Sequence, residues 1–210
     1  MVFIQSFNVG VIDGKPRGIT TDGKYLWWTG QTNFNIYQMD KFGNLINTIA
    51  VGAIDNLPEG ITTDGKYLWW IGRQNQNIYQ VDKAGNLINT IAIGAIDPNP
   101  SGITTDGKYL WWIGFNNQNI YQVDKAGNLI NTIAIGAIDS IPLGITTDGK
   151  YLWWIGIEHN NIYQMDKSGN LINTIAIGAT DGEPRGITTD GKYLWWIGTA
   201  NQIIVQWSKI

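Results

Sequence analysis

The sequence predicts an all-β protein in which one unit of four antiparallel strands is repeated five times. The 210-residue chain contains the segment Gly-Ile-Thr-Thr-Asp-Gly-Lys-Tyr-Leu-Trp-Trp five times, each copy starting 42 residues after the last (18 + 42 = 60). Within a unit, short β-prone runs alternate with turn residues, and long segments of helical period are absent. Four short strands repeated at about this interval are typical of a β-propeller blade. The copies begin at Gly18, Gly60, Gly102, Gly144 and Gly186.

The first half of the unit is clearest in its second copy, residues 60–101. Gly60–Thr63 is a short β-prone run that we expect to form the first strand. Asp64-Gly65 then predicts a tight hairpin of type I′, in which both central residues need positive φ. Lys66–Ile71 carries bulky apolar side chains on both faces, as expected for a strand covered by a neighbouring blade on each side.

The second half of the unit supplies two further strands. After a polar loop at 72–76, Asn77–Asp82 reads as the third strand. The turn at 82–86 contains a glycine, and Leu87–Ile93 reads as the fourth strand. Residues 94–101 connect this strand to the next copy.

The repeat frame predicts a closed ring. The fifth copy, 186–210, supplies only three strands, whereas residues 2–10 align with the fourth strand at 86–94. Residues 1–17 therefore complete the fifth blade, which pairs edges that would otherwise stay open. We expect a single domain, 1–210, folded as a five-bladed β-propeller with four antiparallel strands per blade and a last blade closed by strands from both termini.

Composition excludes several classes of function. The chain is 43% hydrophobic and 15% charged with a net charge of −3, which indicates a folded, water-soluble protein and disfavours nucleic acid as a partner. No apolar run is long enough to span a membrane. Cysteine is absent and His159 is the single histidine, so we expect no metal and no cofactor. The first residues lack a signal-like pattern, which fits a cytoplasmic protein.

The blade pattern resembles the NHL/YVTN-type β-propeller family across all five units. This resemblance implies blade architecture more than activity, since such blades serve in binding, scaffolding and occasionally catalysis. The Trp-Trp pair and the five blades, rather than six or seven, depart from the family. In blade number alone the chain is similar to five-bladed lectins of the tachylectin-2 type, which bind N-acetylated sugars in pockets around the ring. The residues that carry the family resemblance are Pro58–Ile61, Asp64-Gly65, Asn77-Ile78, Asp82 and Gly85–Leu87.

The second and third units, 60–101 and 102–143, differ at five of 42 positions, and all five fall in two segments: the loop after the second strand and the connection from the fourth strand to the next blade. In an up-and-down blade both segments lie on one side of the disc, here called the loop face. This pattern favours a face diversified for binding, although connecting loops also tolerate change more readily. The variable positions are Gln31, Arg73, Phe115, Ile157 and Thr199 in the loops, and Arg17, Glu59, Ser101, Leu143 and Arg185 in the connections.

Three sets of repeated residues near this face are candidates for ligand binding. An exposed second Trp of each pair could stack on a sugar, although interblade packing is the alternative: Trp28, Trp70, Trp112, Trp154 and Trp196. An Asn opening the third strand could bond a ligand or its own backbone: Asn35, Asn77, Asn119 and Asn161. An Asp before the proline connection could bind a ligand or, more simply, hold loop amides: Asp13, Asp55, Asp97, Asp139 and Asp181.

Two hypotheses of function follow, with a third behind them. The first is a multivalent lectin with equivalent interblade pockets, whose weak single-site affinity would be amplified by multivalency. The second is a protein-interaction scaffold that uses the loop face as one composite surface. No catalytic constellation is visible and a fivefold repeat disfavours an asymmetric site, so we expect no enzyme; a lactonase-like propeller is the third hypothesis. We expect a monomer that binds a glycan or a protein.

Overall fold

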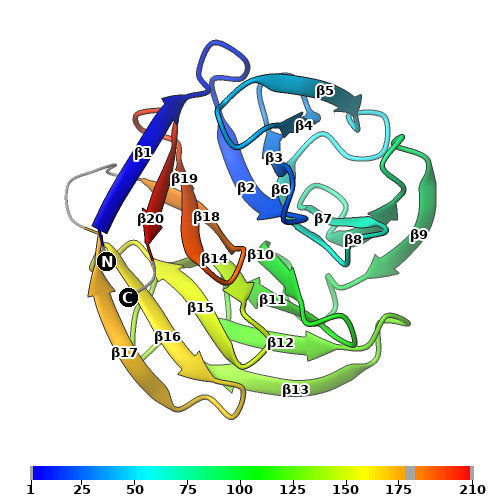
Figure 1. The fold of residues 1–210 in the computed structure, drawn as a ribbon. Helices are drawn as coiled ribbons and strands as arrows, with labels where there is room; N and C mark the ends of the chain where they lie inside the picture. Colours follow the sequence, from blue (N-terminus) through cyan, green and yellow to red (C-terminus); the bar gives the residue numbers. More distant parts are fainter. Residues whose placement is uncertain (1, 178–182, 209–210) are drawn as a thin grey trace.

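The computed structural model describes residues 2–177 and 183–208, and it shows a ring of five separate four-stranded antiparallel sheets (Figure 1). This arrangement confirms the predicted five-bladed β-propeller. In each blade the four strands lie side by side, ordered from the centre of the ring to its rim. The innermost strands of neighbouring blades contact each other around the axis. Among the residues described, no helix is suited to crossing a membrane.

The strands take four positions in the blades. The innermost strands are β2 (Pro16–Thr21), β6 (Pro58–Thr63), β10 (Pro100–Thr105), β14 (Pro142–Thr147) and β18 (Pro184–Thr189). The second strands are β3 (Leu26–Gly30), β7 (Leu68–Gly72), β11 (Leu110–Gly114), β15 (Tyr151–Gly156) and β19 (Tyr193–Gly198). The third are β4 (Asn35–Met39), β8 (Asn77–Val81), β12 (Asn119–Val123), β16 (Asn161–Asp166) and β20 (Ile203–Ser208). The outermost are β5 (Leu45–Ala50), β9 (Leu87–Ala92), β13 (Leu129–Ala134), β17 (Leu171–Ala176) and β1 (Val2–Asn8).

The fifth blade is closed by both ends of the chain, as predicted. Its strand order is β1-β20-β19-β18, so the N-terminal strand is the outer strand of a sheet whose other members come from the C-terminal region. Strand β1 pairs antiparallel with β20 from Val2↔Ser208 to Asn8↔Ile203. Strand β1 lies beside β20 in Figure 1.

The Trp-Trp pairs fill the spaces between blades. Trp69 and Trp112 share one buried cluster although they belong to neighbouring blades, whereas Trp111 packs on the far side with Trp154. Successive side chains of a strand point to opposite faces of the sheet, so each pair serves two interfaces. This explains why the second strand is apolar on both faces.

Glycines bring the innermost strands unusually close together at the ring centre. A Cβ added at Gly60 would lie 2.6 Å from the Ser101 carbonyl oxygen and 2.7 Å from the Ile103 nitrogen, both in the next blade. The same backbone crowding recurs at Gly18, Gly102, Gly144 and Gly186. The repeat-opening glycine is therefore a requirement of the ring and not only of its own strand.

The Asp-Gly turn differs from the predicted type I′ hairpin. Gly65 has a φ of 90°, but Asp64 is not among the residues of positive φ. Instead the Asp64 Oδ1 accepts hydrogen bonds from the amides of Lys66 and Tyr67 at 3.2 and 2.9 Å. These side-chain bonds form the turn without the positive φ that a type I′ turn would require at Asp64. The flanking strands are also displaced, because β6 begins at Pro58 and β7 at Leu68.

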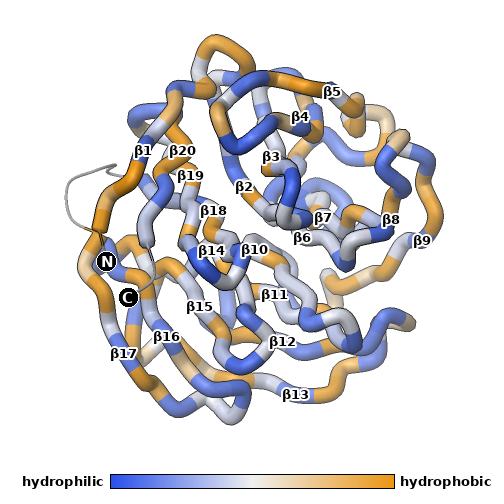
Figure 2. Tube along the Cα trace, viewed as in Figure 1, coloured by the Kyte–Doolittle hydropathy of each residue, from blue (hydrophilic) through white to orange (hydrophobic). Residues whose placement is uncertain are grey.

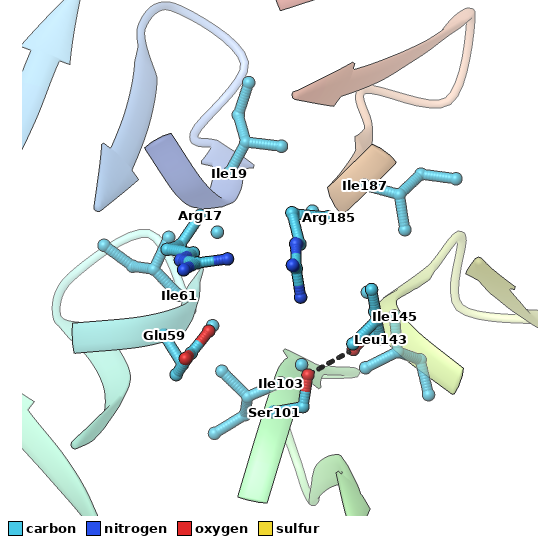
Figure 3. Close-up of a pocket in the computed structure, with 15 residues that line it drawn as sticks. Arg17, Ile19, Glu59, Ile61, Ser101, Ile103, Leu143, Ile145, Arg185 and Ile187 are labelled. Atoms are coloured by element: carbon cyan, nitrogen blue, oxygen red, sulfur yellow. Dashed lines mark hydrogen bonds between the residues drawn. The ribbon is translucent and has the colours of Figure 1, made fainter. Parts of the chain in front are cut away.

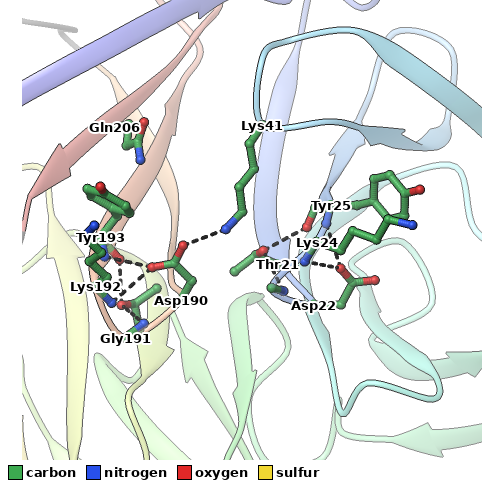
Figure 4. Close-up of polar contacts among 12 residues, drawn as sticks. Thr21, Asp22, Lys24, Tyr25, Lys41, Asp190, Gly191, Lys192, Tyr193 and Gln206 are labelled. Carbon is green, nitrogen blue, oxygen red and sulfur yellow. Dashed lines mark hydrogen bonds and ion pairs between the residues drawn. The ribbon is translucent and has the colours of Figure 1, made fainter.

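On the face opposite the loop face, the same aspartates join neighbouring blades. The Asp64 Oδ2 lies 2.9 Å from Lys125 Nζ of the next blade and accepts a bond from Trp69 Nε1 at 3.1 Å. The Lys41–Asp190 pair spans the junction of the first and fifth blades in the same way (Figure 4). Interblade pairs of this kind are Lys41–Asp190, Lys83–Asp22, Lys125–Asp64 and Lys167–Asp106.

These pairs predict acid-sensitive stability. Burial acts to raise the pKa of the Asp64 carboxyl, but bonds from the Tyr67 amide, Lys125 and Trp69 outweigh it and lower that pKa. A lowered folded-state pKa stabilises the protein above the unfolded pKa of about 3.9 and loses that effect as pH falls. We expect the free energy of unfolding, measured with urea and tryptophan fluorescence, to decrease between about pH 5 and pH 3.

Lys125→Met supplies the control for this pH dependence. The Lys125 side chain is 36% exposed, so solvent screening limits the expected loss of stability at neutral pH to less than about 1 kcal/mol. The variant should show a shallower pH dependence than the parent protein. Identical slopes would mean that these pairs do not couple proton binding to folding.

The outer rim carries half-exposed aliphatic side chains. Figure 2 shows hydrophobic stretches along the outermost strands. Leu87 and Ile88 of β9 are 49% and 50% exposed, and the pair recurs at the same place in β5, β13 and β17. The main core therefore lies between blades, whereas the outermost strands bury few side chains.

Candidate functional site at the centre of the loop face

The two variable segments meet on one face because an aspartate joins them in each of the first four blades. The Asp55 Oδ1 accepts a bond from the Leu57 amide in the connection at 2.9 Å. Its Oδ2 accepts a bond from the Asn75 amide in the loop at 2.8 Å. The same carboxylate thus fixes both variable segments beside each other.

These aspartates are structural groups. They are at most 2% exposed, and in the first blade Asp13 accepts bonds from three loop amides and from the Tyr37 hydroxyl. Bonds of this kind hold the connection and the loop together. This placement fits the simpler of the two expectations for Asp13, Asp55 and Asp97; Asp139 holds the loop amides in the same way, but Glu158 and His159 also lie beside its carboxylate. Asp181 lies outside the described residues.

The second Trp of each pair does not offer a face to a sugar, which corrects the expectation of an exposed indole. Trp28, Trp70, Trp112, Trp154 and Trp196 are at most 1% exposed. Trp70 packs on Tyr79 with ring centroids 4.7 Å apart, as its counterparts in three other blades do. The large apolar indole is buried between blades because this removes the most surface from water.

The asparagines that open the third strands lie half-buried and bond locally. Asn77 Nδ2 donates to the Tyr79 hydroxyl at 3.1 Å, and the same pairing recurs in the other three blades that have this Asn. These side chains help to position the tyrosine that packs against the indole. No described contact directs Asn35, Asn77, Asn119 or Asn161 toward an interblade pocket.

The variable connection residues instead converge at the mouth of the central channel. Each of them directly precedes the close-packed glycine of an innermost strand, so the ring itself brings them together. Figure 3 shows Arg17, Glu59, Ser101, Leu143 and Arg185 around this opening. A depression of about 100 Å³ extends outward from it, lined by Glu59, Arg73, Asn99, Ser101, Phe115, Leu143 and Arg185.

One side of the mouth is a polar network that crosses from the first blade to the second. Arg17 Nε donates to Gln31 Oε1 at 2.8 Å, and Gln31 Nε2 donates to Glu59 Oε1 at 2.9 Å. Arg73 lies 3.4 Å from the same Glu59 oxygen. The buried Glu59 carboxylate is therefore compensated by the residues around it.

Positive charge is crowded at this mouth. Burial lowers the pKa of Arg17, and the charges of Arg185 and Arg73 lower it further, while the charges of Glu59 and Glu183 act in the other direction without reversing the shift. Arg185 Nε is buried and has no hydrogen-bond partner among the described residues. Its NH2 group lies 3.4 Å from Glu183 Oε2. An anionic group placed here would relieve both the repulsion and the unpaired donor.

The other side of the mouth is largely apolar. Leu143 is 6% exposed and lines the depression with the half-buried Phe115. Ser101 uses its hydroxyl to bond the Leu143 carbonyl oxygen at 3.0 Å. The fivefold ring thus has an asymmetric centre, because the five connection positions hold different residues. Ile157 and Thr199 occupy the matching loop positions of the fourth and fifth blades, outside this depression.

The fold and this site define a five-bladed β-propeller with a charged, asymmetric centre. No protein-family model and no curated protein matches the sequence. Myxococcus xanthus glutaminyl cyclase is similar with a TM-score of 0.80 and 10% identity, over 97% of this chain and 94% of that one. A catalytically inactive virginiamycin B lyase from Staphylococcus aureus, with quinupristin, has a TM-score of 0.60 and 22% identity over 93% of this chain.

A third similar structure is a chain of a nidogen/laminin complex, with a TM-score of 0.62, 20% identity, and coverage of 82% of this chain and 67% of that one. This chain spans about two thirds (66%) of the length of the lyase. At these identities the likeness concerns the fold. At that level the expected resemblance to NHL/YVTN-type propellers is confirmed.

These comparisons correct one expectation from the sequence. Fivefold repetition had suggested that the protein is not an enzyme, yet a lyase and a glutaminyl cyclase share its fold. A repeated framework can hold an asymmetric site when a few loop residues differ, as they do at this channel mouth. Repetition therefore does not exclude catalysis.

Proposed function

We propose that the protein is a protein-interaction propeller that binds one acidic, partly apolar peptide segment of its partner at the centre of the loop face. This is the composite-surface hypothesis, with a defined centre. The observation that carries it is the convergence of Arg17, Arg73 and Arg185 beside Leu143 and Phe115.

The size of the depression favours a macromolecular partner. Sites for whole small molecules usually enclose about 300 to 1,000 Å³, whereas this one holds about 100 Å³. Such a volume suits the end of a single side chain or a terminal carboxylate, with the rest of the partner lying on the surrounding loops. Arginine and aromatic residues at the centre of a surface are also typical of protein interfaces.

The charges favour an acidic segment. Three arginines face two glutamates, Glu59 and Glu183, so a carboxylate from the partner would meet an excess of guanidinium groups. Bidentate pairing with Arg185 would use a buried donor that now lacks a partner among the described residues. The apolar side of the mouth would take a neighbouring aliphatic or aromatic side chain of the same segment.

A displayed library of random linear peptides tests this function. Peptides selected on the intact ring should be enriched in Asp or Glu next to apolar residues, and titration should give one site per ring. Arg17→Ser and Arg185→Ser, which copy Ser101 of the third blade, should each weaken binding roughly tenfold or more. Lys24→Ser, on the opposite face, is the control and should leave binding unchanged.

Other outcomes would decide against the proposal. Selected peptides without acidic residues, or unchanged binding in both arginine variants, would remove it. A glycan that binds at five equivalent sites would instead support the lectin hypothesis.

A further inference from the structure

The fourth blade contains a cluster of potential metal ligands that is not repeated in the other blades, as far as their residues are described. Its loop after β15 carries Glu158 and His159, whereas the second blade has Gln74 and Asn75 at these positions. Its connection carries Ser140 in place of the second blade's Asn56. Three changes in one blade thus meet beside the invariant aspartate, here Asp139. The residues of the cluster are not among those that line the channel mouth, and the inference does not depend on the function proposed above.

The three acidic and imidazole side chains lie within reach of a single ion. One potential ligand atom from each of Asp139, Glu158 and His159 lies within 4.8 Å of the others. His159 Nδ1 is 3.3 Å from Asp139 Oδ2. Two ligands that each lie about 2.1 Å from a tetrahedral metal are about 3.4 Å apart, so this pair needs almost no movement to share an ion.

The framework around these atoms is already fixed. Asp139 is 1% exposed, and its carboxylate is held by the amides of Ile141 and His159 and by the Tyr163 hydroxyl. The Glu158 Oε2 accepts bonds from the Ser140 amide and hydroxyl at 2.9 and 2.6 Å. These bonds use one Glu158 oxygen, which leaves Oε1 to turn toward an ion. Such outer contacts orient ligands in metal sites.

The comparison with the second blade shows what His159 replaces. There the side-chain nitrogen Nδ2 of Asn75 donates to the Ile54 carbonyl oxygen and to the Tyr79 hydroxyl at 3.1 Å each. An Asn at this position therefore completes a structural network. His159 instead places an imidazole nitrogen against Asp139, with its side chain 55% exposed to water. Two carboxylates and one imidazole with an open side form a donor set suited to a transition-metal dication.

We propose that Asp139, Glu158 and His159 form a metal-binding site for a dication such as Zn²⁺, with water completing its coordination. The ion would neutralise two carboxylates held close together, one of them buried. It would also tie the connection before β14 to the loop after β15. This assignment differs from the expectation, based on a single histidine, that the protein binds no metal.

Isothermal titration with Zn²⁺, together with the visible absorption of bound Co²⁺, tests the site. The intact protein should bind one ion. His159→Asn restores the residue of the other blades, so it should fold normally and reduce affinity at least about tenfold. Glu158→Gln should do the same, whereas Asn75→Gln in the second blade is a control that should leave affinity unchanged.

Transfer of the site to the second blade provides a test by gain of binding, which a misfolded variant would not mimic. The triple variant Asn56→Ser, Gln74→Glu, Asn75→His should raise the stoichiometry from one ion to two. Absence of binding by the parent protein, or equal affinity in His159→Asn, would overturn the assignment. A transferred loop that folds but binds no second ion would overturn it as well.

Discussion

Gly60→Ala is expected to destabilise the ring by about 3 kcal/mol, at the upper end of the cost of overpacking. The added Cβ would lie 2.6 Å from a carbonyl oxygen and 2.7 Å from a nitrogen of the next innermost strand. Both atoms belong to backbone, so no side-chain rotation can relieve the clash. The strand β10 would have to move outward, and this would also displace Ser101 at the channel mouth. Urea unfolding followed by tryptophan fluorescence measures the change.

Gly65→Ala is the matched control. Gly65 has a φ of 90° with no atom within 4 Å of an added Cβ, so the substitution strains the backbone without a clash. Its cost should be about 1 to 2 kcal/mol. If Gly60→Ala costs no more than Gly65→Ala, the close approach of the innermost strands does not determine the need for glycine at Gly60.

Trp112→Ala is expected to cost about 3 to 5 kcal/mol, because it leaves a large cavity at an interface between two blades. Trp112 is fully buried and packs in a cluster that includes Trp69 of the preceding blade and Tyr121 of its own. Blades without a shared core would separate, so we expect a lower cooperativity of unfolding as well as a lower midpoint. Calorimetry and urea unfolding measure the two effects.

Trp112→Phe separates packing from hydrogen bonding. The Trp112 indole N–H has no hydrogen-bond partner among the described residues, so phenylalanine should lose only volume. Its cost should be well below that of Trp112→Ala. Equal losses in the two variants would contradict a packing role and would indicate that the indole nitrogen has a required partner.

The architecture could be predicted from the sequence because the repeat period determines both the number of blades and how the ring closes. The interval of 42 residues between Gly18 and Gly60 defines the blade, and the frame offset predicts that β1 closes the last one. The predictions that were wrong depend on single side chains. Asp64 was expected to adopt a left-handed conformation, but its carboxylate forms the turn instead and also reaches Lys125 of the next blade.

The site was predicted only in outline. Sequence variation marked the loop face, but repeated residues such as Trp70 and Asp55 were chosen as ligand contacts although they are buried. The useful signal was the residue before each close-packed glycine, since only ring closure brings Arg17, Glu59 and Arg185 to one point. A period along the chain does not reveal which of its positions face the axis. That information comes from the tilt and packing of the strands.

The outer strand of the fifth blade has a consequence for folding during synthesis. Val2 meets Ser208 across the sheet, a separation of 206 residues, so β1 leaves the ribosome long before β20 is made. Until then Phe3 and Ile4 have no sheet to join, and the other four blades form before the fifth one is complete. Strands β5, β9, β13 and β17 share the sequence LINTIA, so one of them from a second nascent chain can pair with the edge of β20 in place of β1. Crowded polysomes should therefore favour strand-exchanged dimers over unfolded monomers.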